Sequence, residues 1–75
     1  MDNSPHFLAK VSYRILLLRS ENKMTQAQLA KKLHTSQQTV SRLESFGYKG
    51  HSVKTLDKIA KIFNKRLAIQ FEERQ

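Results

Sequence analysis

Residues 24–44 are the part of this 75-residue chain that most limits how it can fold. Thr25 stands just before an apolar periodic stretch, and Gln28 follows at the spacing of a capping box, which marks the start of a helix. The apolar residues after this cap recur at helical spacing and make one face: Leu29, Ala30 and Leu33. The pattern predicts a short helix over about 26–33.

A second short helix is predicted directly after the first, over about 37–45. Either Thr35 or Ser36 caps its start, and Val40 and Leu43 point inward. The residues left on its outer face are polar and able to reach the edges of bases: Gln37, Gln38, Ser41 and Arg42. Two short helices joined by a tight turn, with the second one exposing such side chains, have the layout of a DNA-reading helix-turn-helix.

The string TQ-x-x-LA…S-x-x-T-V-S-x-x-E in this stretch resembles the Cro-like phage-repressor (XRE) helix-turn-helix family. The resemblance covers about residues 14 to 63. It implies that the helix over 37–45 enters the major groove and that the helix over 26–33 braces it across the DNA backbone. In that family the turn is usually Gly followed by an aliphatic residue, whereas this chain has His34 and Thr35. Histidine tolerates a positive φ less easily than glycine does.

The net charge supports a polyanionic partner but does not identify it. Fourteen Lys and Arg against six Asp and Glu give a formal charge of +8, which favours DNA, RNA or an anionic membrane. The chain has no cysteine, so it holds neither a disulfide nor a thiolate metal site, which is compatible with a reducing cytoplasm. Without a signal peptide pattern or a long apolar run, we expect a cytoplasmic protein that does not enter a membrane.

Two further helices complete the predicted domain, which we place at residues 1–65. One ends near Glu21, and the other spans about 53–63. The fold class is therefore all-α, a compact bundle of four or five short helices. The helix that ends near Glu21 is apolar over much of its circumference, so we expect it to be buried on two sides. Its second side packs within the domain or forms a surface for another subunit or protein.

The chain changes its pattern after Asn64. Over 66–72 apolar and polar residues alternate, with Leu67, Ile69 and Phe71 on one face. This predicts a C-terminal β-strand, with a frayed helical extension as the alternative. No other segment of the chain looks like a strand. The simplest partner for the predicted strand is therefore the same segment of a second copy, across a two-fold axis. We therefore read 66–75 as a dimerisation tail, and in this it resembles, more loosely, antitoxins of the HigA and HipB types.

Candidate DNA contacts fall into two groups. Gln37 and Gln38 are the predicted base readers, because a glutamine amide matches the N6/N7 edge of adenine. Arg42, about one turn beyond Gln38, takes a guanine or a phosphate. The predicted phosphate ligands are a first-turn amide, two hydroxyls and two lysines that the resemblance places near the backbone: Gln26, Ser36, Ser41, Lys49 and Lys54.

The remaining charged residues are interpreted structurally. The resemblance implies that Arg19 and Glu44 form a part-buried ion pair that ties two helices together. The lysines of the last helix recur at helical spacing opposite its apolar face, which is typical of a solvated surface: Lys54, Lys58, Lys61 and Lys65. Among them, Lys54 is the exception proposed above.

Enzyme and metal functions find no support in the pattern. His6, His34 and His51 have no cysteine neighbours and no histidine or carboxylate three or four residues later, so no metal site is expected. The chain also lacks a nucleophile elbow and a glycine-rich phosphate loop. We predict a non-enzyme that needs no cofactor.

The sequence therefore predicts a dimeric transcriptional repressor that binds a palindromic operator in double-stranded DNA. The alternative is the antitoxin of a type II toxin–antitoxin pair, which binds and inhibits a cognate toxin and autoregulates its operon. An RNA-binding or coactivator-type adaptor is a third option, but the exposed residues provide no aromatic platform for stacking bases.

Overall fold

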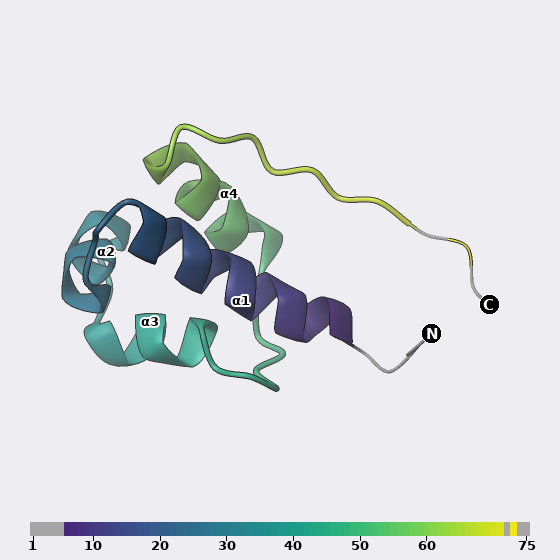
Figure 1. Cartoon of the computed structure of the whole chain (residues 1–75), viewed down its shortest axis with the longest axis horizontal. Coiled ribbons are helices and arrows are strands. Elements are labelled where there is room, and N and C mark those ends of the chain that lie inside the picture. Colours follow the sequence, from purple (N-terminus) through teal and green to yellow (C-terminus); the bar gives the residue numbers. More distant parts are fainter. Residues whose placement is uncertain (1–5, 72, 74–75) are drawn as a thin grey trace.

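The computed structural model describes residues 6–71 and 73, and this part of the chain contains four helices (Figure 1). Their bounds are α1 His6–Glu21, α2 Gln26–Leu33, α3 Gln37–Leu43 and α4 Val53–Ile62. Figure 1 shows α2 beside the C-terminal end of α1, with α3 and α4 on opposite sides of α1 in that view. The predicted all-α fold with four helices is confirmed, and the described residues contain no fifth helix.

Three helices begin at a side-chain cap. At α2 the predicted capping box is present: Thr25 Oγ1 accepts a hydrogen bond from the Gln28 backbone N at 3.1 Å, and Thr25 N donates to Gln28 Oε1 at 2.7 Å. Ser36 and Ser52 cap α3 and α4 by accepting from the backbone amide of the third helical residue. These bonds satisfy amides that a helix start otherwise leaves without a partner.

Left-handed residues follow three of the helices. Lys23, His34 and Asn64 have φ values of 54°, 58° and 57°. After α2, His34 N donates to Lys31 O at 3.1 Å and Thr35 N donates to Ala30 O at 2.9 Å, which is the Schellman pattern. His34 therefore occupies a conformation that usually belongs to glycine, and the turn keeps its geometry without one.

The core lies where the helices meet. Its buried members come from all four helices and the residue after α4: Ile15, Leu29, Ala30, Leu33, Val40, Leu43, Ile59 and Phe63. On the other side of α1, Tyr13 is 59% exposed, whereas Leu16 and Leu17 are partly buried. The expectation that α1 is buried on two sides is thus met only in part within one chain. The side chains of residues 6–9 lie outside those described.

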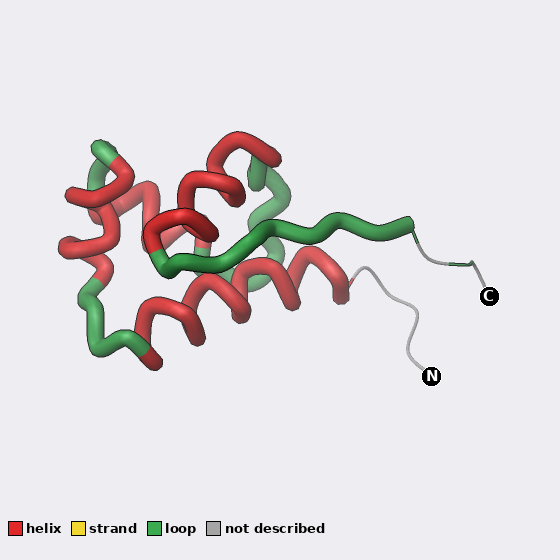
Figure 2. The backbone as a smooth tube through the Cα atoms, turned by 90° about the horizontal axis from the view of Figure 1, so that it is seen from above, coloured by secondary structure: helices red, strands yellow, loops and turns green. Residues whose placement is uncertain are grey.

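The predicted C-terminal strand is wrong for the single chain, because the described residues contain no strand. Beyond α4 the backbone turns back and extends toward the end of the molecule where α1 begins, without helix or strand (Figure 2). Leu67 is partly buried, Ile69 is 59% exposed and Phe71 is fully exposed. A strand needs a neighbour for its backbone groups, and no other described segment supplies one. Residues 72 and 74–75 lie outside the described part.

Candidate nucleic-acid interface

Helix α3 divides into an inner and an outer face. Val40 is fully buried and Leu43 is 3% exposed, so the inner face holds the helix against the core. The predicted base readers Gln37, Gln38 and Arg42 are all exposed. Gln38, Ser41, Arg42 and Ser45 line an open hollow of about 280 Å³ on this outer face. The structure thus brings most of the predicted α3 contacts together on one surface.

The two predicted phosphate hydroxyls are placed differently. Ser36 Oγ accepts from Thr39 N at 3.1 Å and lies 3.0 Å from Thr39 Oγ1, so it serves first as the cap of α3. Ser41 is exposed and borders the hollow, and its backbone oxygen accepts a hydrogen bond from Ser45 Oγ at 2.8 Å. Of the two, Ser41 has the freer hydroxyl.

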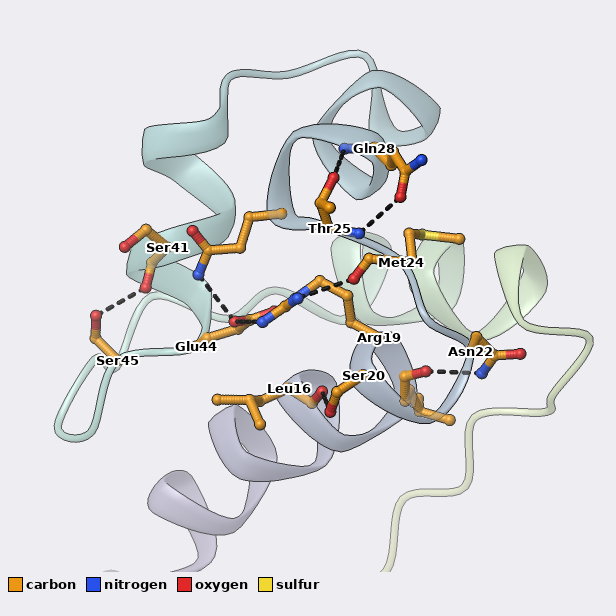
Figure 3. A network of polar contacts seen from close by, with 12 residues as sticks. Leu16, Arg19, Ser20, Asn22, Met24, Thr25, Gln28, Ser41, Glu44 and Ser45 are labelled. Carbon is orange, nitrogen blue, oxygen red and sulfur yellow. Dashed lines mark hydrogen bonds and ion pairs between the residues drawn. The ribbon is translucent and has the colours of Figure 1, made fainter.

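Arg19 and Glu44 join α1 to the end of α3 (Figure 3). Arg19 Nε donates to Glu44 Oε2 at 2.6 Å, and Arg19 Nη2 donates to Oε1 at 3.0 Å. Arg19 Nη1 also donates to the Met24 carbonyl oxygen at 2.9 Å. The Arg19 side chain is 16% exposed and that of Glu44 is 3% exposed, so the pair is largely screened from water.

The pKa of Arg19 is raised above its ordinary value, chiefly because the guanidinium donates to the Glu44 carboxylate. Partial burial opposes this rise, and the negative charge of Glu44 adds to it. A guanidinium is already charged at any ordinary pH, so Arg19 keeps its charge throughout the range in which proteins fold.

Gln26 also reaches Glu44. Its side-chain Nε2 donates to Glu44 Oε1 at 3.0 Å, and Gln26 is partly buried at the first position of α2. The sequence indicated Gln26 as a phosphate ligand but not this contact. The two residues are 18 positions apart on different elements, so no periodic pattern links them.

The loop between α3 and α4 is tied back to the core by a histidine that the sequence did not single out as structural. His51 Nε2 donates to the Leu43 carbonyl oxygen at 2.8 Å and lies 3.3 Å from Oγ of Ser12, which is 1% exposed. The ring of Tyr48 packs edge-on against that of His51, with centroids 5.0 Å apart. This anchor holds the loop that carries Lys49, which is exposed.

The lysines of α4 are exposed at Lys54, Lys58 and Lys61. Lys61 Nζ lies 3.1 Å from Asp57 Oδ2 in a pair that is open to solvent and contributes little to stability.

Within the part of the chain that the structure describes, no group of three or more His, Cys, Asp or Glu residues is placed to hold a metal ion. In that same part, no helix combines the length and the apolarity needed to cross a membrane.

Comparison with known proteins adds to this geometry. A family model described as helix-turn-helix matches residues 15–70, which include α2, α3, α4 and the end of α1. The chain belongs to the XRE-type helix-turn-helix family. This is a DNA-binding family of transcription regulation and not a family of enzymes. A search of curated proteins finds no match.

A solved structure of a HipA–HipB–O2–O3 complex contains a chain similar to this XRE-type protein. The two share 27% sequence identity, the match covers 97% of each chain, and the TM-score is 0.66. The looser resemblance to HipB-type antitoxins is thereby supported over almost the whole length.

Proposed function

We propose that this XRE-type protein is a sequence-specific repressor that binds double-stranded DNA as a dimer on a palindromic operator. The outer face of α3 is the observation that supports the proposal best. Its polar side chains stand free around an open hollow, while Val40 and Leu43 fix the helix from behind. Because Val40 and Leu43 hold the helix in place, its backbone loses little conformational freedom when its outer face enters the major groove.

The proposed base readers are Gln37, Gln38 and Arg42. A glutamine amide donates and accepts at once, which matches the N6/N7 edge of adenine. Arg42 borders the same hollow as Gln38 and carries the fork of donors that suits O6 and N7 of guanine. We therefore expect adenine at the positions facing the glutamines and guanine, or a phosphate, near Arg42.

Phosphate binding supplies most of the affinity and fixes the register. The proposed ligands come from α2, from α3 and its cap, from the following loop and from the start of α4: Gln26, Ser36, Ser41, Lys49 and Lys54. The formal charge of +8 favours any nucleic acid, so these contacts hold the duplex without choosing its sequence.

The proposed dimer forms through the C-terminal tail. Ile69 and Phe71 are exposed apolar residues on a segment that has no partner within the described chain. Pairing with the same segment of a second copy would bury both and satisfy the backbone groups between them. A two-fold axis then presents two α3 helices to two half-sites.

A second candidate function is supported by the similarity to a chain of the HipA–HipB–O2–O3 complex. On this alternative the protein is an antitoxin that binds and inhibits a cognate toxin and regulates its own operon. Both functions use the same DNA-reading surface, so they differ only in the protein partner. A toxin-like reading frame beside the gene, and co-purification of its product with this chain, would favour the antitoxin.

One experiment tests the DNA-binding proposal directly. Duplexes that bind the protein are selected from a random pool, and the solution mass of the free protein is measured in parallel. We expect an inverted repeat with half-sites about one helical turn apart and a mass of two chains. Selection of no common sequence would contradict sequence-specific binding, and a single half-site with a monomer mass would contradict the dimer.

A further inference from the structure

The carboxylate of Glu44 is an acceptor shared by three donors from two other helices. Arg19 supplies two of them, Nε to Oε2 at 2.6 Å and Nη2 to Oε1 at 3.0 Å, and Gln26 Nε2 supplies the third, to Oε1 at 3.0 Å. The Glu44 side chain is 3% exposed, so this arrangement fills almost its whole surface. The hydrogen bond from Gln26 is not part of the ion pair between Arg19 and Glu44, so it calls for an explanation of its own.

The third bond fixes the orientation of the Gln26 amide. A glutamine NH₂ group carries two donor hydrogens and its carbonyl oxygen accepts, and a solvated glutamine samples many orientations. Here one hydrogen is directed at Glu44, and the described residues give the amide no other hydrogen bond. The second hydrogen is therefore held in a defined direction at the first position of α2, and no described residue accepts it.

The charge of Glu44 would repel a phosphate at that place if it were not balanced. Arg19 balances it through two hydrogen bonds and is itself only 16% exposed, so the guanidinium is committed to Glu44 and to the Met24 carbonyl. The two charges of the network are thus paired with each other, and the Gln26 amide is its neutral donor.

We propose that Glu44 is a positioning residue for DNA binding: it orients the amide of Gln26 toward one backbone phosphate in each half-site. Glu44 touches no DNA in this arrangement, and it acts only through Gln26. The inference rests on the proposed function and adds a role that a purely structural ion pair would not have.

A phosphate scan separates this role from a structural one. Duplexes of the selected sequence carry a neutral methylphosphonate at one backbone position each, and the affinity of every duplex is measured for wild type, Gln26→Ala and Glu44→Gln. For wild type, roughly tenfold loss is expected at the phosphate that Gln26 contacts. Both variants should lose this sensitivity at that one phosphate and keep the wild-type profile at the others.

Two controls accompany the scan. Lys54→Ala should lose its sensitivity at a different phosphate, which shows that the method resolves single contacts. Glu44→Asp keeps the carboxylate charge but shortens its reach, so it tests the positioning role if Glu44→Gln does not fold. All measurements are made below the thermal transition of each variant.

The outcomes are distinguishable. If wild type binds no duplex, the proposed function fails and this inference fails with it. If wild type binds but Glu44→Gln and Glu44→Asp weaken all duplexes equally, Glu44 is only structural and the inference alone is wrong. The inference is also wrong if Gln26→Ala leaves the phosphate profile unchanged.

Discussion

At the scale of single residues, the turn of the helix-turn-helix has a histidine, His34, at the position where the family usually has glycine. His34 takes φ 58° and ψ 46°, where a Cβ atom is crowded by the neighbouring carbonyl. The family pattern indicated where this left-handed position falls, because glycine usually stands there. It did not indicate that the turn would keep its hydrogen bonds with a histidine.

This position gives a first prediction. His34→Gly should stabilise the fold by up to about 1 kcal/mol, because relief of the left-handed strain exceeds the entropy that glycine loses on folding. Thr35→Gly is the matched control, since Thr35 is not among the positive-φ residues, and it should destabilise. Urea unfolding of both variants measures the two changes. Equal destabilisation by both would mean that His34 is not strained.

His51 shows what sequence patterns could not reveal. Its partners Leu43 and Ser12 lie 8 and 39 positions away, so no local spacing connects the three. The sequence allowed only the statement that His51 is not a metal ligand. The one available signal was the position of Ser12 beside the apolar residues Val11 and Ile15 of α1, and it names no partner.

A second prediction follows from this anchor. His51→Phe keeps a ring but removes the donor to the Leu43 carbonyl, so it should cost about 1–3 kcal/mol of unfolding free energy. Lys49→Ala in the same loop is exposed and should cost less than about 0.5 kcal/mol. Thermal unfolding compares the two. A loss for His51→Phe no larger than for Lys49→Ala would show that the histidine does not anchor the loop.

At the scale of elements, sequence reasoning succeeded where the determinants are local. The starts of α2 and α3 were predicted from a Thr or Ser cap, and the structure has these caps at Thr25 and Ser36. Helix α3 ends at Leu43, two residues before the predicted end, where Ser45 N donates to Arg42 O. The contact between α1 and the end of α3, made by Arg19 and Glu44, was predicted only from the family resemblance.

The joint between α1 and α3 gives a third prediction. Arg19→Met should cost roughly 3–5 kcal/mol, because it leaves the carboxylate of Glu44 buried without its charge partner. Combining it with Glu44→Leu should recover much of this loss, since no unpaired charge remains. Thermal unfolding of the two single variants and the double variant completes the cycle. Strictly additive losses would show that the two residues are not energetically coupled.

At the scale of the whole molecule, the error over 66–72 has a physical cause. The alternation of Leu67, Ile69 and Phe71 is a strand pattern, and the segment does leave helical geometry after Asn64. Strand formation, however, depends on a second strand, which periodicity within one segment cannot supply. In the proposed dimer, a second copy of the chain supplies that strand.

Truncation after Lys65 tests the tail. If the tail forms the dimer, the truncated protein should be a monomer at concentrations where the full chain is a dimer, and it should keep its helices because the buried core ends at Phe63. Binding to a single half-site should persist weakly, and binding to the full palindrome should drop steeply. Solution mass and affinity for half and full sites measure both effects. An unchanged dimer would move the interface to the side of α1 that carries Tyr13.

The most direct test of the central claim, that α3 reads sequence while other residues hold phosphates, compares two variants on two kinds of DNA. Affinities of wild type, Gln38→Ala and Lys54→Ala are measured on the selected operator and on random duplex over a range of salt concentrations. Gln38→Ala should lose roughly 1–3 kcal/mol on the operator and little on random DNA. Lys54→Ala should weaken both about equally and flatten the salt slope by about one unit. Equal losses on both kinds of DNA for both variants would contradict this division of roles.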